Sequence, residues 1–246
     1  MTTERIALMR YIYIDIVNFS VGRSVEAQTQ IIHALSRVVR LAVTSAGVEG
    51  QQVLYLPTGD GVCVCLVDLP EPFDLDVRIA LSVLEQLYGL SLAEVDEERR
   101  FAVRIGLNEN QDNLVVDIGG GRNVVGLGIN TAHRIMSLAG PFQLFLGASV
   151  HARLWQRSRY RDHLHPVDAI VKHGERVLCY AFHDPSMSCF AAASVDRRRN
   201  AGPAAPAAPA ASRPAIQMPL QLPPREARRR QARSAPSFRI AGNGGS

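Results

Sequence analysis

Two aspartates at the ends of apolar segments are the strongest candidates for chemistry in this sequence. Asp15 lies near the end of the apolar stretch 11–17, and Asp60 lies between two glycines in a turn that separates two further apolar stretches. This spacing predicts one carboxylate at the end of a buried strand and one at the tip of a hairpin. Two neighbouring carboxylates repel each other, and Mg²⁺ or Mn²⁺ relieves the repulsion by binding their oxygens. An Asp-Gly turn alone is usually only a turn, so it is the pair that predicts a metal site.

Hydrophobic periodicity predicts the elements that would hold these aspartates. After the strand over residues 11–20, a helix is expected from Ser24 to about Ala46, and the hairpin of residues 54–67 follows. The later expectations are a helix over 75–90, strands over 101–107 and 114–118 joined by a polar turn at 108–113, a loop at 119–121, a helix over 130–136, a strand over 141–146, a helix over 149–155, and a closing strand pair at 167–171 and 177–182. This order predicts an α/β fold, an α+β sandwich with a ferredoxin-like βαββαβ core and a largely antiparallel sheet.

The composition divides the chain into a folded part and a tail. The 246 residues are 47% hydrophobic, which is enough for one sizeable core. Residues 1–183 hold 17 Lys and Arg against 20 Asp and Glu, whereas residues 184–246 hold 10 against 3. The basic excess therefore belongs to the tail. We expect one domain over residues 1–183 and an Ala/Pro/Arg-rich disordered tail over residues 184–246.

The sequence predicts a cytoplasmic protein without a membrane segment. No apolar run is long enough to span a bilayer, and the N-terminus has no signal-peptide pattern. The four cysteines form no CxxC pair. Cys63 and Cys65 lie at alternate positions of an apolar stretch, which predicts core thiols in a reducing compartment.

Four motifs occur in the order found in class III nucleotidyl cyclases, and the chain resembles the catalytic domain of that family from about residue 8 to residue 183. The motifs are Asp15-Ile16 with Phe19-Ser20, Thr58-Gly59-Asp60-Gly61, Arg104-Ile105-Gly106-Leu107, and residues 126–134 with the sequence GLGINTAHR. The short length and the segment from Arg23 to Gln28 further resemble the pyrimidine (uridylate or cytidylate) cyclases of bacterial anti-phage (Pycsar) systems. The resemblance implies conversion of a nucleoside triphosphate to a 3′,5′-cyclic nucleotide and pyrophosphate, as a second messenger in anti-phage defence.

The resemblance also implies roles for individual residues. Asp15 and Asp60, with the Ile16 carbonyl, would hold two Mn²⁺ or Mg²⁺ ions per site. Asn130 and Arg134, four residues apart on one helix face, would orient the ribose and stabilise charge at the α-phosphate. In this family the latter pair reaches the site from the opposite subunit, which implies a homodimer with two shared sites.

Phosphate contacts are implied for the loop after the first strand and for a late basic residue. The backbone N–H groups of Phe19 and Ser20 would bind the β- and γ-phosphates. Lys172, the only lysine in the sequence, lies near the position where the family often supplies a phosphate-binding lysine, and Arg176 is close to it. Both residues fit ordinary exposed charges equally well.

Two positions of the implied base pocket depart from purine cyclases. Leu56 stands where those enzymes typically place a lysine, and Asn123 stands where adenylate cyclases place an acidic residue. Leu56 offers no donor to adenine, whereas the Asn123 amide matches O4 and N3–H of uracil or, once flipped, cytosine. Tyr55 is a further candidate beside the pocket, although strand alternation points it the other way. UTP is the expected substrate, then CTP, then a purine nucleotide.

Two other classes of function compete with a cyclase. A degenerate cyclase fold could serve as a dimerisation or nucleotide-binding module, and the presence of all of Asp15, Asp60, Asn130 and Arg134 argues against it. The Arg-rich tail could bind nucleic acid through phosphate contacts. From residue 197 onward its only aromatic residue is Phe238, so such binding would be accessory.

Overall fold

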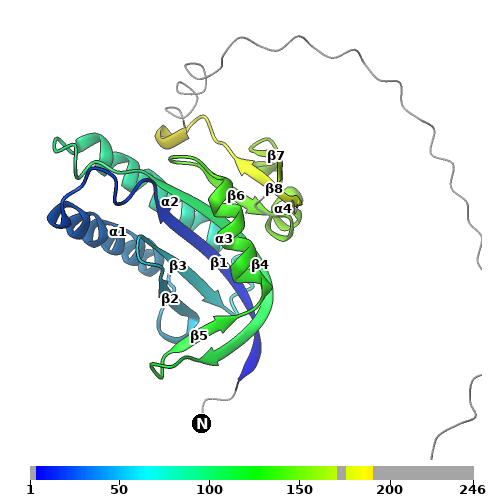
Figure 1. Cartoon of the computed structure of the whole chain (residues 1–246). Helices are drawn as coiled ribbons and strands as arrows, with labels where there is room; N and C mark the ends of the chain where they lie inside the picture. Colours follow the sequence, from blue (N-terminus) through cyan, green and yellow to red (C-terminus); the bar gives the residue numbers. More distant parts are fainter. Residues whose placement is uncertain (1–3, 171–175, 191–246) are drawn as a thin grey trace, which may run out of the picture. The chain divides into compact units, whose positions relative to one another are not determined.

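The computed structural model describes residues 4–170 and 176–190. The first half contains β1 (Arg5–Ile16), α1 (Val25–Ser45), the 3-10 turn η1 (Gly50–Gln52), β2 (Val53–Pro57), β3 (Gly61–Val67), α2 (Leu75–Ala93) and β4 (Val103–Val116). The second half contains β5 (Arg122–Val125), α3 (Leu127–Leu138), β6 (Leu144–Gly147), α4 (Ala148–Trp155), α5 (Ser158–Arg161), β7 (Leu164–Ile170) and β8 (Arg176–Phe182). Figure 1 shows α1 and α2 on one side of the sheet and α3 on the other.

One sheet organises the fold. Its strands follow the order β2-β3-β1-β4-β6-β8-β7, and β5 pairs with the last residues of β4. Neighbouring strands are antiparallel except β4 and β6, which are parallel. The segment from β1 to β4 forms a βαββαβ unit with both helices on one face, which is a ferredoxin-like core. The predicted α/β class with a largely antiparallel sheet is confirmed.

Side chains alternate between the two faces of the sheet, and the faces are covered differently. Ile12, Ile14 and Ile16 of β1 are buried in the main core under α1 and α2. Tyr11 and Asp15 point to the opposite face, where α3 lies (Figure 1). The predicted site face is therefore the one that α1 and α2 leave uncovered.

Local signals place the two long helices where the sequence predicts them. Ser24 caps α1, since its Oγ accepts the Ala27 N–H at 3.3 Å. The buried residues of α1 and α2 recur at helical spacing and face the sheet. These amphipathic stripes explain why both helices lie on the same side of the sheet.

The polar turn expected at residues 108–113 is wrong, because β4 is one continuous strand of 14 residues. The polar side chains of this stretch find partners on both faces of the sheet, and Glu109 pairs with Arg10 at 2.8 Å on the side of α1 and α2. The Asn108 amide donates to the Gly128 carbonyl at 3.0 Å, and the Tyr11 hydroxyl donates to Asp112 at 2.5 Å. Buried polar groups with hydrogen-bond partners are tolerated, so this run does not end the strand. Neither β5 nor α5 was expected, and the strand expected at 141–146 is β6.

Helix α3 rests directly on Gly106 of β4. A Cβ atom at this position would lie 2.4 Å from the Met136 backbone nitrogen and 2.6 Å from the Ala132 carbonyl oxygen. Only glycine permits this close approach of helix and strand. Gly106 therefore sets the height of α3 above the sheet.

Gly106→Ala is expected to lower the free energy of unfolding by about 1–3 kcal/mol, because backbone atoms of α3 must move away from the new methyl group. Gly89→Ala in α2 is the matched control, since a Cβ there meets nothing within 4 Å and alanine favours a helix. Urea unfolding of both variants checks the expectation. Equal stability of the two would contradict the close packing of α3 on β4.

The main core includes residues beyond the expected boundary at residue 183. Cys189 and Phe190 are buried in it, and the Cys189 N–H donates to Glu85 of α2 at 3.2 Å. The remainder of the expected tail, from residue 191, lies outside the described residues. Cys63 and Cys65 are buried, as expected of core thiols; Cys179 and Cys189 are buried as well, and none of the four forms a disulfide. Among the helices that the structure describes, none has the length and apolar character needed to cross a membrane.

Candidate active site

The two candidate metal-binding carboxylates meet at the end of β1. Asp15 is the next-to-last residue of that strand and is 8% exposed, and Asp60 lies half-buried in the turn between β2 and β3. The Ile16 N–H donates to the Asp60 carbonyl at 3.1 Å. Gly61 makes this approach possible, because a Cβ there would lie 2.2 Å from the Ile14 carbonyl oxygen. The predicted hairpin tip is thus held against the end of β1.

A third charged group, Arg104 of β4, lies directly opposite Asp15. Its Nε and Nη2 atoms lie 2.8 and 2.7 Å from Asp15 Oδ2. Burial raises the pKa of the Asp15 carboxyl above its usual value, Arg104 opposes this rise, and the Asp60 carboxylate adds to it. The site therefore holds two acidic groups that need cationic partners. The sequence motif that contains Arg104 does not indicate which residue Arg104 pairs with. The antiparallel register of β1 and β4 places Arg104 opposite Asp15.

The donor set fits a divalent cation that is also bound by phosphate. Within residues 4–170 and 176–190, no group of three His, Cys, Asp or Glu side chains is arranged to hold a metal ion. Mg²⁺ in nucleotide sites commonly takes one or two carboxylates and completes its shell with waters and substrate phosphates. Asp15 and Asp60, with the adjoining backbone of Ile16, match that small set.

The loop after β1 carries the two predicted phosphate-binding residues. Phe19 is half-buried against the main core, whereas Ser20 is exposed. The chain turns at Asn18, whose φ is 53°, a left-handed conformation in which Asn is enriched. The Val21 N–H closes the turn on the Asn18 carbonyl at 3.2 Å. The loop is therefore a short turn that begins beside Asp15.

Helix α3 carries Asn130 and Arg134 over the same face of the sheet as Asp15. Both side chains are exposed, whereas Ala132 on the inner side of the helix is buried. They lie one helical turn apart, and the Asn130 amide donates to the Gly126 carbonyl at 3.1 Å. An exposed pair on this helix can reach a molecule that covers the face.

His133 and Tyr13 join the site without having been singled out in the sequence. Their ring centroids lie 5.2 Å apart, and burial raises the pKa of Asp15 while Arg104 and, to a smaller extent, His133 oppose the rise. Burial raises the pKa of the Tyr13 phenol, and Cys63 and Asp15 add to the rise. The sequence could have indicated Tyr13, because alternation along β1 puts the side chains of residues 13 and 15 on the same face of the sheet. The approach of His133 depends on how α3 crosses the sheet.

Leu56 and Tyr55 lie on opposite faces of β2. Leu56 pairs with Cys63 and contacts the apolar cluster on the α3 side. Tyr55 pairs with Val64 on the α1 side, where burial raises the pKa of its phenol and Arg40 opposes the rise. The placement of Tyr55 among the substrate-binding residues is therefore corrected, because strand alternation turns it away from Leu56.

Asn123 lies in β5, close to η1 and β2. Arg122 donates to the Gln51 carbonyl at 2.9 Å, and Val124 is buried in the cluster that Leu56 contacts. Asn123 Oδ1 accepts the Val124 N–H at 2.7 Å. A backbone N–H can bond only to the oxygen of the amide, so this contact assigns the amide orientation. Nδ2 has no hydrogen-bond partner among the described residues, and strand alternation places Asn123 on the face of β5 opposite to Val124 and the cluster that Leu56 contacts.

The two basic residues near the end of the domain, Lys172 and Arg176, cannot be placed in the site. Lys172 lies outside the described residues. Arg176 is the first residue of β8, and its side chain is also outside what the structure describes. The phosphate contacts considered below therefore come from the loop after β1.

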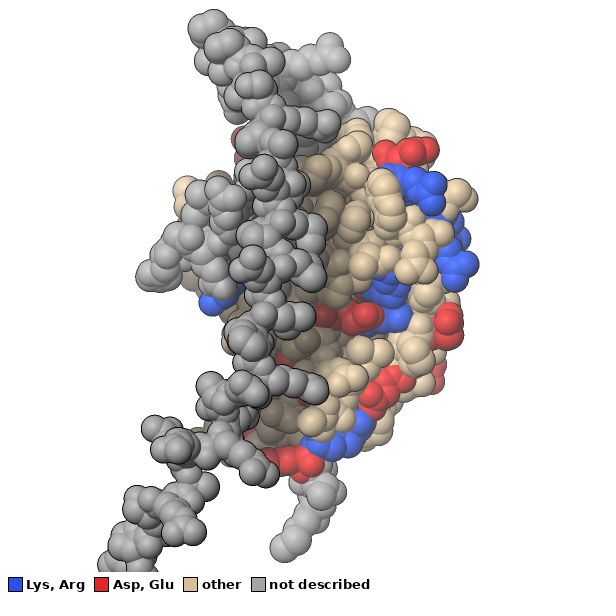
Figure 2. Space-filling view, turned by 90° about the vertical axis from the view of Figure 1, so that its right-hand side faces the viewer, with Lys and Arg blue, Asp and Glu red and all other residues tan. Residues whose placement is uncertain are grey.

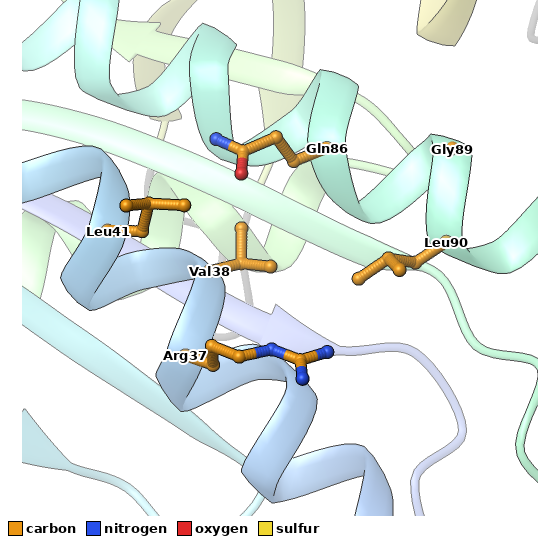
Figure 3. Close-up of a pocket in the computed structure, with 6 residues that line it drawn as sticks. All are labelled: Arg37, Val38, Leu41, Gln86, Gly89 and Leu90. Atoms are coloured by element: carbon orange, nitrogen blue, oxygen red, sulfur yellow. The ribbon is translucent and has the colours of Figure 1, made fainter. Parts of the chain in front are cut away.

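The groove between α1 and α2 is distinct from the face that carries the candidate site. On the visible part of the face in Figure 2, basic and acidic side chains are interspersed among other residues, and an acidic and a basic group lie together near its middle. A groove of about 370 Å³ lies instead between α1 and α2 (Figure 3) and is lined by Arg37, Val38, Leu41, Gln86, Gly89 and Leu90. Because these helices cover the other face of the sheet, this groove is separate from Asp15 and Asp60.

Comparison with solved structures identifies the fold. The catalytic core of a rhodopsin-guanylyl cyclase with converted specificity, solved with ATPαS, matches with a TM-score of 0.58 and 19% identity over 74% of this chain and 98% of its own. The adenylyl cyclase CyaB from P. aeruginosa matches with a TM-score of 0.60 and 15% identity over 74% of this chain and 96% of its own. The guanylate cyclase domain of RhGC from Catenaria anguillulae, solved with GTP, matches with a TM-score of 0.56 and 19% identity over 74% of this chain and 98% of its own. No protein-family model and no curated protein matches the sequence. The fold is that of class III adenylate and guanylate cyclase catalytic domains.

Proposed function

We propose that this protein is a nucleotidyl cyclase whose catalytic domain spans residues 1–183 and the packed residues that follow them. The observation that carries the proposal is the meeting of Asp15 and Asp60 at the end of β1, on the face over which α3 presents Asn130 and Arg134. Solved structures with this fold are adenylate and guanylate cyclases. Carboxylates beside exposed amide and guanidinium groups support a role in attack of a ribose hydroxyl on a phosphate.

Each candidate residue has a separate role in the proposed reaction. The ribose 3′-OH must lose its proton and attack the α-phosphate in line while pyrophosphate leaves. Asp15 and Asp60, with the Ile16 carbonyl, would hold two Mn²⁺ or Mg²⁺ ions, which would activate the hydroxyl and neutralise phosphate charge. Asn130 orients the ribose, and Arg134 stabilises the charge that develops at the α-phosphate. The loop after β1 directs N–H groups at the outer phosphates.

We further infer a homodimer with two shared sites. Asn130 and Arg134 are exposed in one chain. Large apolar side chains are exposed on the nearby β4–β5 hairpin and at the start of α3, namely Val116, Ile118, Val125 and Leu127. Exposed apolar patches mark interaction surfaces. A two-fold partner on this surface brings α3 of one subunit to Asp15 of the other.

Incubation of the purified protein with ATP, GTP, CTP and UTP in the presence of Mn²⁺ tests the proposal. Mass spectrometry is expected to show a 3′,5′-cyclic nucleotide and pyrophosphate. A folded protein that binds nucleotide but makes no cyclic product from any of the four would be a degenerate module, and the proposal would be wrong.

UTP is the substrate we propose, followed by CTP and then by purine nucleotides. The Asn123 NH₂ group makes no hydrogen bond among the described residues, and such a donor fits the O4 acceptor of uracil but not the exocyclic amine of cytosine or adenine. Guanine shares such an acceptor, and Leu56, in place of the lysine typical of purine cyclases, argues against it. The resemblance of the segment from Arg23 to Gln28 to Pycsar cyclases supports a role in anti-phage signalling in the cytoplasm.

Asn123→Asp is expected to lower kcat/KM for UTP by roughly ten- to a hundredfold, because a carboxylate presents an acceptor to O4. Preference should shift toward bases with an exocyclic amine. Asn113→Asp, the same change at an exposed position of β4, is the matched control. Competition among the four nucleotides, with products separated by mass, measures both effects. If wild type prefers ATP or GTP over UTP and CTP, the pyrimidine proposal fails and the cyclase proposal stands.

A further inference from the structure

Arg23, between the loop after β1 and helix α1, donates to four backbone carbonyls. Its Nη1 donates to the Asn18 carbonyl and, at 3.0 Å, to the Phe19 carbonyl. Its Nε and Nη2 donate to the Glu98 and Arg100 carbonyls at 2.9 and 3.0 Å, in the connection between α2 and β4. One guanidinium thus joins the loop after β1 to a segment 75 to 77 residues away in the sequence.

The two loop carbonyls decide where the N–H groups of the loop point. In a trans peptide, the C=O and N–H of one plane point in opposite directions. Because the carbonyls of Asn18 and Phe19 are turned toward Arg23, the N–H groups of Phe19 and Ser20 are turned away from it. Neither N–H has a hydrogen-bond acceptor in the described part of the chain. Two successive N–H groups left open in this way are the donors with which a backbone loop binds an anion.

Neighbouring hydrogen bonds hold the backbone around Arg23. The Gln28 side chain donates to the Arg23 carbonyl at 3.2 Å. The N–H and Oγ of Ser24 donate to the Glu98 carboxylate at 3.1 and 2.7 Å, and these bonds lower the pKa of Glu98. Arg23 and Gln28 are the first and last residues of the segment that resembles pyrimidine cyclases, and the side chains of both make hydrogen bonds to the backbone at the loop or at the start of α1.

We propose that Arg23 is a positioning residue that holds the loop after β1 in the conformation that binds the outer phosphates of the substrate. This inference rests on the proposed cyclase function. The planar guanidinium of Arg23 donates from three nitrogen atoms to carbonyls of two segments at once. A lysine ammonium has all its N–H donors on one atom and cannot reach both segments. Replacement of the Arg23 guanidinium therefore removes the hydrogen bonds that hold the loop after β1. It does not remove a group that contacts the reacting atoms.

Arg23→Lys tests the proposal, with Arg37→Lys as the matched control on α1. Arg37 lines the groove between α1 and α2 and makes no hydrogen bond to the loop after β1 among the described residues. Calorimetry with Mg²⁺ measures the affinity for inorganic tripolyphosphate and for UMP, which lacks the outer phosphates. We expect Arg23→Lys to weaken tripolyphosphate binding and to raise KM for UTP, each by roughly tenfold, as expected for loss of a hydrogen bond to a charged group. UMP affinity, kcat and the melting temperature should change much less, and Arg23→Gln should show at least as large an effect.

Each other outcome overturns the proposal in a distinguishable way. If Arg23→Lys retains wild-type tripolyphosphate affinity and KM while wild type makes cyclic nucleotide, Arg23 does not position the loop and the cyclase function stands. If tripolyphosphate and UMP affinities fall together with the melting temperature, Arg23 has a general structural role instead. If wild type makes no cyclic nucleotide from any triphosphate, the proposed function fails, and the role of Arg23 in it fails as well.

Discussion

Asp60→Ala is expected to abolish cyclic-nucleotide formation while leaving the fold and the dimer intact. The change removes one of two carboxylates available to a divalent ion and leaves Asp15 paired with Arg104. Metal activation and charge neutralisation supply several kcal/mol in such reactions, and a loss of roughly 4 kcal/mol lowers kcat by about a thousandfold. The Asp60 side chain lies in a half-buried turn and has no hydrogen bond in the described part of the chain, so its loss should cost little stability.

Product formation across a titration of Mg²⁺ and Mn²⁺ measures the effect of Asp60→Ala. Asp162→Ala is the matched control, because this exposed aspartate follows α5, far along the sheet from the carboxylate pair. Circular dichroism and size-exclusion chromatography verify the fold and the dimer. Full activity in Asp60→Ala, or wild-type activity that survives metal chelation, would contradict the assignment.

Mixing Asp15→Ala with Arg134→Ala is expected to restore activity that neither variant has alone. If the two residues meet only across a two-fold interface, a heterodimer has one site with both changes and one site with neither. Random pairing makes half of the dimers mixed, so about a quarter of wild-type activity is the statistical expectation. Activity measured after subunit exchange checks this result.

A second mixture provides the control for complementation. Asp15→Ala and Asp60→Ala alter the same half of the site, so every site in their heterodimer lacks one carboxylate, and no recovery is expected. Recovery in this mixture, or no recovery with Arg134→Ala after exchange has been verified by mass spectrometry, would rule out the shared-site arrangement.

Local spacing in the sequence was enough to predict the long helices and the position of both aspartates. Ser24 and the apolar repeat that follows it predict α1, because capping and amphipathic periodicity act within a few turns. Asp60 lies in the tight turn that Gly59 and Gly61 indicate, because turn chemistry is also local. The fold class followed from the order of these elements, and the comparisons with solved cyclase structures agree with it.

Only the tertiary structure decided which distant groups face one another. The polar stretch 108–113 resembles a turn when taken alone, but pairing with β1 and bonds such as Tyr11 to Asp112 keep it in a strand. Arg104 meets Asp15 through strand register, and Arg23 meets Glu98 across 75 residues. Such partners depend on long-range pairing and packing, which a local pattern of residue types does not encode. The sequence alone therefore determined the two long helices and the places of Asp15 and Asp60 along the chain, whereas strand pairing and packing decided that Arg104 faces Asp15 and that Arg23 binds the loop after β1.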